Sequence, residues 1–258
     1  MGRLFARLLG KKHRVLICGR NTERTKKTAA QLHVGAGSIA EIAEADAVIV
    51  SVPIENTVDV CKDVLGRMRE NSLLIDISSI KTGVADKIAE IVPSGVEYLS
   101  LHPLFGPSTR QLKGQNMVAI RMKAGPLSSR MLASIQDIGF STQISTVEEH
   151  DRTMASLQVM HHYAYLIMAV ELAKTISENR VASGFFTRSL KRTWNQLHSL
   201  QKISETVVGI QRLNPYGYSA RRSYAESAQR MMAMSGEAVS EITEALKIVG
   251  STSSSSLL

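Results

Sequence analysis

Short apolar runs alternate with helix-like stretches through the first 145 residues, and this alternation most constrains the fold of the chain. Two of the runs, 47–53 (AVIVSVP) and 72–77 (SLLIDI), are apolar almost throughout. Strands that are apolar on both faces are typical of parallel sheets covered by helices on both sides. The predicted order is strand 13–18, helix 22–32, short helix 38–44, strand 47–53, helix 55–69, strand 72–77, a helix, a strand that ends at His102, and strands 117–122 and 141–144 with a helix between them. We therefore expect residues 1–145 to form an α/β domain with a Rossmann-like parallel sheet.

From Thr146 onward the sequence carries no strand signal and is typical of long helices. Residues 146–149 (TVEE) read as a capping box, with the Thr146 hydroxyl facing the third amide and Glu149 reaching back, so a helix should run from there to about Ser177. Residues 186–213 and 217–249 are predicted to form further helices. We expect an all-α domain over 146–250 and a frayed, low-complexity tail over 251–258.

The composition excludes several classes of partner. The net charge is +8, but the basic residues are scattered and only 5% of residues are aromatic. Without a nucleic-acid-binding signature, this charge favours a basic crevice for anionic small molecules over nucleic acid. The longest apolar stretches, near 45–54 and 163–173, are shorter than the roughly 18–20 residues of a membrane span, so no membrane partner is expected.

Cys18 and Cys61 are the only cysteines, and both lie in apolar segments. We expect them to be small core residues of a cytoplasmic protein, because they offer neither a disulfide framework nor the spacing of a metal site. The sequence contains no convincing cluster of metal-ligating residues, so no metal is expected.

His102 is the strongest candidate for chemistry. It ends an apolar strand, and the turn after it (residues 103–107, PLFGP) is stiffened by two prolines and a glycine. A histidine held in this way can take a proton from a substrate hydroxyl near neutral pH. Residues 76–81 (DISSIK) bring Ser79 and Lys81 to another strand end. Ligands of open α/β sheets bind at the carboxyl ends of the strands, so both clusters should face one crevice.

A parallel sheet followed by a helical domain is common among nicotinamide dehydrogenases, but the GxGxxG fingerprint is absent. Gly2 and the apolar helix after it are typical of the last position of that fingerprint, so the chain is expected to start internally, with a strand and two glycines upstream. Cofactor contacts are assigned to Gly2, to Arg20, Asn21 and Thr22 after strand 13–18, and to Ser51, Val52 and Pro53 after strand 47–53. Arg20 stands where a 2′-phosphate would bind, which favours NADP over NAD. The alternative is that this stretch is an ordinary solvated loop.

Three blocks resemble the prephenate dehydrogenase family of tyrosine biosynthesis: residues 76–81 (DISSIK), 101–107 (LHPLFGP) and 149–162 (EHDRTMASLQVMHH). The third is the most distinctive, because generic Rossmann dehydrogenases lack an EHD motif followed by a second histidine twelve residues after its own. The resemblance implies oxidative decarboxylation of prephenate to 4-hydroxyphenylpyruvate with hydride transfer to NAD(P)+. It also implies a homodimer formed through the C-terminal helices.

The resemblance implies a role for each matching residue. His102 would accept the proton of the ring hydroxyl, Ser79 would hydrogen-bond both, and Lys81 would contribute to substrate or cofactor electrostatics. His162 would contact the substrate, and Gln158 shares its helix face at i and i+4. His150 lies about 18 Å from His162 on one helix, so we assign it to the cofactor side or to a structural role. Ser108, directly after the proline-rich turn, is also assigned to the substrate.

One stretch departs from the family pattern. The family places an arginine directly after a glycine, shortly before an Asn/Asp-Pro pair, to bind a substrate carboxylate, but here Ile210 follows Gly209. Arg212 could serve after a shift of one turn, and Lys202 could replace a second arginine upstream. Lysine lacks the bidentate fork of arginine and would weaken or redirect the grip on a carboxylate.

Three alternatives stay open. Arogenate, which carries an amine where prephenate has a keto group, is the nearest substrate alternative. A related β-hydroxyacid or imine reductase would be expected to carry a catalytic lysine on the long helix, where this chain has His150 and His162. A non-catalytic dimeric relative that binds ligand to regulate other enzymes is the third, suggested by the absent first strand and the displaced arginine.

Overall fold

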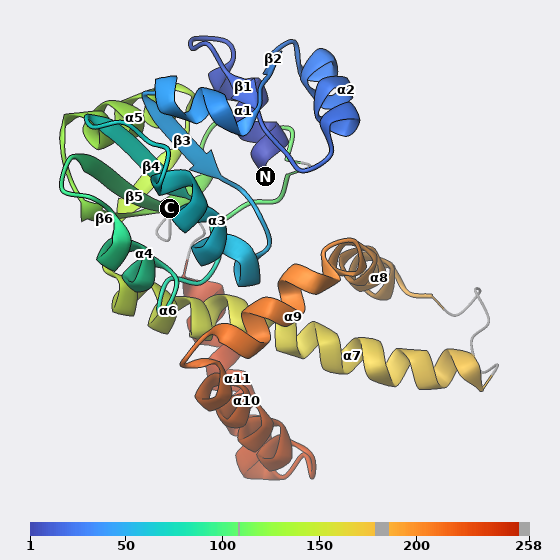
Figure 1. Cartoon of the computed structure of the whole chain (residues 1–258). Coiled ribbons are helices and arrows are strands. Elements are labelled where there is room, and N and C mark those ends of the chain that lie inside the picture. Colours follow the sequence, from blue (N-terminus) through green and yellow to red (C-terminus); the bar gives the residue numbers. More distant parts are fainter. Residues whose placement is uncertain (108, 179–185, 253–258) are drawn as a thin grey trace.

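The computed structural model describes residues 1–107, 109–178 and 186–252 of the chain, as an α/β domain followed by a helical part (Figure 1). The larger sheet has five strands in the order β3-β4-β5-β6-β7. They are β3 (Ala47–Val50), β4 (Ser72–Asp76), β5 (Val96–Pro103), β6 (Asn116–Lys123) and β7 (Ser141–Ile144). A separate parallel pair joins β1 (Leu16–Ile17) to β2 (Gly35–Ala36). The Rossmann-like class predicted from the alternation is confirmed, although the strand predicted at 13–18 is shorter.

Strand direction differs from the prediction at one place. β3, β4 and β5 are mutually parallel, but β6 runs antiparallel to β5, and β7 is again parallel to β6. The segment between β5 and β6 contains no helix among its described residues. Parallel neighbours need a crossover, usually a helix, and without one the chain simply turns back. The sheet is therefore parallel except at the β5–β6 pair, where the strand direction reverses.

The core lies on both faces of this sheet. All five residues of β4 are buried, which explains why its sequence is apolar throughout. Leu74 packs in the cluster on the side of α3 (Thr57–Leu65) and α4 (Ala85–Ile91), whereas Leu73 and Ile75 pack with α1 (Gly2–Leu9) and α5 (Pro126–Asp137). The period of two places neighbouring side chains on opposite faces. Three further elements complete the domain: α2 (Thr22–Leu32), η1 (Ile39–Glu44) and η2 (Ile54–Asn56).

The helical part contains more interruptions than predicted. The helix expected over 146–177 is α6 (Val147–Met154), a π-helical turn η3 (Ala155–Val159) and α7 (Met160–Ser177). The stretch 186–213 divides into α8 (Arg188–Gln201) and α9 (Ser204–Leu213), and 217–249 into α10 (Gly217–Met231) and α11 (Gly236–Ser251). The last break falls at Met234, whose positive φ ends a helical path. Residues 253–258 of the tail lie outside the described residues.

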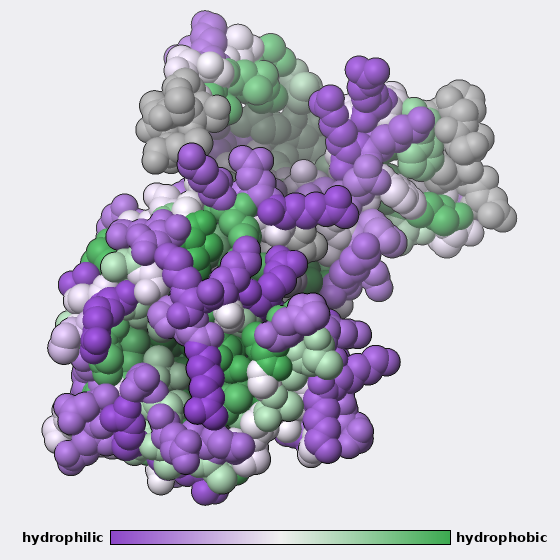
Figure 2. All heavy atoms as spheres, turned by 90° about the horizontal axis from the view of Figure 1, so that it is seen from above, coloured by the Kyte–Doolittle hydropathy of each residue, from purple (hydrophilic) through white to green (hydrophobic). Residues whose placement is uncertain are grey.

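Two local predictions need correction. The Thr146 hydroxyl accepts the Glu149 amide as expected, but the Glu149 carboxylate accepts from the Ser145 hydroxyl, so only half of the capping box forms. Cys61 is buried, whereas Cys18, directly after β1, is exposed, and its thiol donates to the Ser38 carbonyl. Seen from above, hydrophilic side chains dominate this face of the molecule and apolar ones show between them (Figure 2).

Candidate active site

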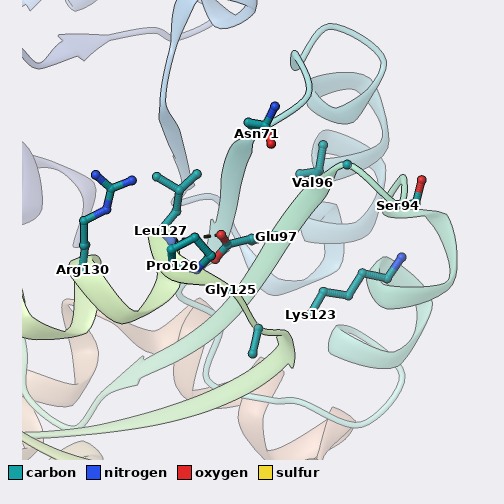
Figure 3. A pocket seen from close by; sticks show the side chains of 11 residues that line it. Asn71, Ser94, Val96, Glu97, Lys123, Gly125, Pro126, Leu127 and Arg130 are labelled. Atoms are coloured by element: carbon teal, nitrogen blue, oxygen red, sulfur yellow. Dashed lines mark hydrogen bonds between the residues drawn. The ribbon is translucent and has the colours of Figure 1, made fainter.

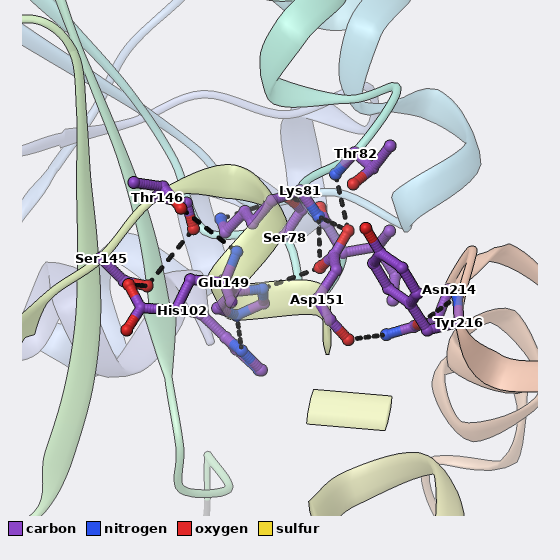
Figure 4. A network of polar contacts seen from close by, with 12 residues as sticks. Ser78, Lys81, Thr82, His102, Ser145, Thr146, Glu149, Asp151, Asn214 and Tyr216 are labelled. Carbon is purple, nitrogen blue, oxygen red and sulfur yellow. Dashed lines mark hydrogen bonds and ion pairs between the residues drawn. The ribbon is translucent and has the colours of Figure 1, made fainter. Parts of the chain in front are cut away.

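His102 is the second-last residue of strand β5 and is buried, with 3% of its surface exposed. Its Nδ1 lies 2.8 Å from Nε2 of His150, and the two rings meet edge to face. Figure 4 shows His102 and Asp151 in the same network of polar contacts. Nδ1 of His150 in turn lies 2.7 Å from Oδ1 of Asp151. Three side chains thus form one hydrogen-bonded row that joins β5 to α6. We assigned His150 to the cofactor side or to a structural role, and the structure places it directly beside His102.

Asp151 is the meeting point of three segments. Its carboxylate accepts the backbone amides of Lys81 at 3.1 Å and Thr82 at 2.7 Å, in the loop after β4. Its backbone carbonyl accepts from Nδ2 of Asn214, at the end of α9, at 2.9 Å. Burial alone would raise the pKa of Asp151, but the hydrogen bonds from His150 and Thr82 outweigh it and hold the pKa below its ordinary value. The residue is therefore an ionised acceptor.

Lys81 is fully buried and points into the protein rather than into an open crevice. Its ammonium donates to the Leu101 carbonyl at 2.8 Å and pairs with Asp76 at 3.2 Å. Tyr98 donates to the other Asp76 oxygen at 2.8 Å. Burial by itself would raise the pKa of Asp76, but the charge of Lys81 and the hydrogen bonds to the carboxylate together outweigh burial and hold the pKa below its ordinary value. Lys81, which we assigned to the substrate, thus contacts the strand end that carries His102.

The predicted hydrogen bond between Ser79 and His102 is not formed. Ser79 is half-buried, and its hydroxyl makes no hydrogen bond to the described residues. The neighbouring Ser78 is the buried serine of this loop and bonds to Asp76. Nδ1 of His102 is occupied by His150, so Ser79 could approach only the other ring nitrogen. That nitrogen, Nε2, makes no hydrogen bond to the described residues.

Gln158 and His162 lie on η3 and on the first turn of α7. Oε1 of Gln158 and Nδ1 of His162 are buried without any hydrogen-bond partner among the described residues. Burial lowers the pKa of His162 to about 4, assisted by the neighbouring His161, so its ring is neutral at pH 7. Buried polar atoms without partners are costly, and a bound ligand is one way to satisfy them. Two of the three such atoms among the described residues thus fall on the residues that we assigned to the substrate, and the third is Oγ of Ser100 on β5.

The predicted cofactor residues occupy two places. The Gly2 amide donates to Oγ of Ser51 at 2.8 Å, and a Cβ at position 2 would lie only 3.1 Å from that hydroxyl. The start of α1 thus meets the end of β3 without a side chain between them, which fits the close approach of a dinucleotide phosphate to a helix start. Val52 and Pro53, directly after Ser51, are exposed.

The second place is the start of α2. Arg20 is exposed there and pairs with no described acidic residue. Asn21 caps α2 by accepting the Arg24 amide at 2.8 Å, and Thr22 is the first residue of that helix. Asn21 therefore has a structural role whether or not a cofactor binds.

Two further predicted residues add no contact to this geometry. Arg212 is exposed near the end of α9 and makes no polar contact to the described residues. Ser108 lies outside the described residues.

Comparisons with known proteins identify the family of this chain. Residues 5–117 match the family model "Prephenate dehydrogenase, nucleotide-binding domain". The chain is 33% identical over 189 residues to the "Probable arogenate/prephenate dehydrogenase" of Methanocaldococcus jannaschii, covering 70% of this chain and 42% of that protein. It is 31% identical over 133 residues to the T-protein of Haemophilus influenzae, covering 52% and 35%. The chain belongs to the prephenate dehydrogenase family. It spans less than half the length of these curated relatives.

Solved structures show that the fold is that of the prephenate dehydrogenase family along nearly the whole chain. The prephenate dehydrogenase of Aquifex aeolicus, solved with hydroxyphenyl propionate and NAD+, superposes with a TM-score of 0.72 at 17% identity, covering 97% of this chain and 92% of that one. A 1-pyrroline-5-carboxylate reductase of Streptococcus pyogenes gives a TM-score of 0.53 at 17% identity, covering 97% and 94%. The reductase alternative is thus the less similar fold.

A pocket of about 480 Å³ lies away from the candidate site around His102 (Figure 3). Val96 and Glu97 line it at the start of β5, whereas His102 lies near the end of the same strand. The Glu97 carboxylate accepts the amides of Leu127 at 2.9 Å and Ser128 at 2.7 Å, so the start of α5 is already capped. Among the described residues, no helix is both long and apolar enough to cross a membrane, and no group of three or more His, Cys, Asp or Glu side chains could hold a metal ion.

Proposed function

We propose that this chain carries out the oxidative decarboxylation of prephenate to 4-hydroxyphenylpyruvate, with hydride transfer to NAD(P)+, in tyrosine biosynthesis. The observation that carries the proposal is His102, a buried histidine whose Nδ1 is held by His150 while Nε2 remains without a partner among the described residues. Burial lowers the pKa of His102 well below 6.5, helped by His150 and Lys81, so the ring is a neutral base at pH 7. A neutral imidazole in this position can accept the proton of a ring hydroxyl.

The reaction balances with one base and one hydride acceptor. Nε2 of His102 takes the hydroxyl proton while the carbinol carbon loses its hydrogen with the bonding electrons. NAD(P)+, when bound, would accept that hydride. The bond to the ring carboxylate then breaks, carbon dioxide leaves, and the electron pair makes the ring aromatic. The new phenolate oxygen takes back the proton from His102, so no metal enters the balance.

Gln158 and His162 are proposed to bind the side chain of the substrate. Oε1 of Gln158 accepts hydrogen bonds only, which specifically favours arogenate, whose ammonium donates. With its amide turned over, the same residue would donate to the keto oxygen of prephenate. Arogenate is therefore the second candidate substrate, and the two are separated by direct assay.

The cofactor is proposed to lie between the start of α1 and the loop after β3, with Gly2 and Ser51 at its phosphates. The exposed Arg20, unpaired among the described residues, supports a preference for NADP over NAD. Replacing Arg20 by Asp should lower kcat/KM for NADP+ much more than for NAD+. An equal loss with both cofactors would contradict this assignment.

We further propose that the protein is a cytoplasmic homodimer formed through its C-terminal helices. None of the 18 residues of α7 is buried, although Ile167, Met168, Val170 and Ile176 lie on it. Exposed apolar side chains in such number are typical of an interface. Two unpaired cysteines agree with a reducing compartment.

The test is reduction of NADP+ and NAD+ with prephenate and, separately, with arogenate, in wild type and in His102→Asn. We expect turnover with prephenate that declines on the acid side as His102 becomes protonated, and a large loss of kcat in the variant. His13→Asn, at an exposed histidine, is the matched control and should leave activity unchanged. Turnover with arogenate alone would move the assignment to that substrate. Binding of either substrate by calorimetry without turnover would favour the non-catalytic relative.

A further inference from the structure

The row His102–His150–Asp151 leaves little freedom in where its protons lie. We propose that His150 and Asp151 are positioning residues that fix His102 in the tautomer with its proton on Nδ1 and its lone pair on Nε2. The placement of protons follows from the hydrogen bonds when the two rings are neutral, a state that the buried Lys81 ammonium nearby favours. Its catalytic consequence rests on the proposed function, in which Nε2 is the base.

Asp151 fixes the first proton of the row, because an ionised carboxylate can only accept hydrogen bonds. Its two oxygens face the backbone amides of Lys81 and Thr82, which are permanent donors, at 3.1 and 2.7 Å. The third neighbour is Nδ1 of His150, 2.7 Å from Oδ1. Two acceptors at this distance would repel each other, so Nδ1 of His150 must carry a proton.

A neutral His150 with its proton on Nδ1 presents only a lone pair at Nε2. That atom lies 2.8 Å from Nδ1 of His102, which must therefore donate. The single proton of the neutral His102 ring is thus held on Nδ1, and Nε2 is left as an acceptor. Both histidines and Asp151 are buried, at 3%, 2% and 0% exposure, so water does not compete for these hydrogen bonds.

A second positive charge in the row is opposed by Lys81. The Lys81 ammonium donates to the carbonyl of Leu101, the residue directly before His102. An imidazolium on His102 would stand beside this buried cation, with His150 on its other side and Asp151 beyond. The neutral arrangement with one defined tautomer is therefore the one that the charges favour.

The row also makes the base depend on how the two parts of the chain pack together. His102 belongs to β5, whereas His150 and Asp151 belong to α6, which α9 holds through the bond from Asn214. A histidine on the sheet alone could exchange its ring proton between two nitrogens. Packing of α6 against the sheet removes that choice.

The decisive variant is Asp151→Asn, which replaces one acceptor oxygen by an NH2 donor. The amides of Lys81 and Thr82 cannot change, so the remaining oxygen should turn towards them and the NH2 towards His150. His150 would then accept at Nδ1 and donate from Nε2, which forces His102 to accept at Nδ1 and carry its proton on Nε2. A wrong histidine tautomer costs serine proteases on the order of 10⁴-fold in kcat, and we expect a loss approaching that size with little change in KM.

The tautomer is measured by ¹⁵N NMR of the full chain with ¹⁵N-labelled histidine. This spectrum distinguishes protonated from unprotonated ring nitrogens, and it needs no substrate. We expect the His102 proton on Nδ1 in wild type and on Nε2 in folded Asp151→Asn, with His13→Gln as the spectral control. An unchanged His102 tautomer in the folded variant would overturn the proposal. A tautomer change in a protein that turns over neither substrate would leave the proposal standing and defeat the proposed function instead.

A second pair of variants decides the question if Asp151→Asn does not fold. His150→Gln keeps an acceptor for Nδ1 of His102, whereas His150→Leu removes it. We expect the Leu variant to show a mixture of His102 tautomers and a much lower kcat than the Gln variant. Equal spectra and equal kcat in the two variants would show that His150 only fills space.

Discussion

The α/β domain and the helical part bury their apolar residues in very different ways. Every residue of β4 is buried, including the charged Asp76, because helices cover both faces of the sheet. α7 has a similarly apolar sequence, yet none of its 18 residues is buried, and it extends away from the sheet (Figure 1). On α11, Leu246 and Val249 are 67% and 71% exposed. Apolar content alone therefore does not say where a core lies, and the helical part presents apolar surfaces that the described residues do not cover.

The largest effect should come from breaking the buried charge pair in the α/β domain. Lys81→Met leaves the Asp76 carboxylate buried without its counter-charge and removes a donor from the Leu101 carbonyl. Removing one partner of a buried pair costs about 3–5 kcal/mol, so the free energy of unfolding in urea should fall by that amount.

Lys12→Met is the matched control, because Lys12 pairs with Asp137 at the surface, with more than half of each side chain exposed. Exposed pairs contribute about 0–1 kcal/mol, and the control should stay within that range. Equal losses in both variants would contradict the distinction between a buried and a solvated pair.

The second-largest effect should come from creating a cavity in the core of the same domain. Leu74 is fully buried between the sheet and the helices α3 and α4, and Leu74→Ala should cost about 2–5 kcal/mol of unfolding free energy. Leu246→Ala removes the same atoms from an exposed position on α11 and should change the stability of the single chain by less than about 0.5 kcal/mol. Urea titrations at low protein concentration compare the two, and similar costs would mean that α11 is covered within one chain.

Mild acid should destabilise the junction between the two parts. The pKa of His102 is well below 6.5 and that of His162 is about 4, so the folded protein keeps both rings neutral while an unfolded chain takes up protons below about pH 6.5. The unfolded state then binds more protons than the folded state, so the free energy of unfolding decreases as the pH is lowered. Buried His102 alone should account for about 1–2 kcal/mol between pH 6.5 and pH 5.

His162→Gln separates the two histidines in this experiment. The variant should lose part of the dependence of the urea midpoint on pH between about 6.5 and 5. The pKa values of Asp76 and Asp151 are already lowered below 3.8, so these carboxyls act only in stronger acid. A full dependence retained in the variant would show that His162 is free to protonate in the folded protein.

The sequence predicted the strands better than the breaks in the helices. Apolar runs such as 72–77 mark buried strands directly, because a strand covered on both faces has no polar period. The antiparallel return of β6 depends on a loop without a helix, which no apolar pattern reports. The π-helical turn contacts a distant helix at its last residue: Nε2 of Gln211, on α9, donates to the Val159 carbonyl at 2.9 Å. A helix predicted from its own period cannot anticipate such a bond.

The candidate site shows the same division. His102 was found from its strand end and stiff turn, both local features. The contact between His102 and His150 joins residues that are 48 positions apart in the sequence. The helical spacing of His150 and His162 indicated only that these two side chains do not contact the same functional group. Asp151 lay within the EHD block but carried no signal of its own. Choosing between Ser78 and Ser79 required knowing which side chain faces inward after β4 ends, and Ser78 is the one that contacts the buried pair of Asp76 and Lys81.

The substitution that we expect to change folding stability least should change assembly most. Val249→Asp places a charge on the exposed apolar face of α11, where the single chain loses little, because the 71% exposed side chain has few contacts to give up. A dimer that buries this face would have to desolvate the carboxylate without a partner, and would dissociate. Sedimentation at micromolar concentration should therefore show a dimer for wild type and a monomer for the variant. Ser240→Asp, also exposed on α11 but not apolar to begin with, is the matched control and should disturb association less. A wild-type monomer at this concentration would mean that the apolar faces of α7 and α11 serve another partner, and the contrast between the two parts of the chain would then need a different explanation.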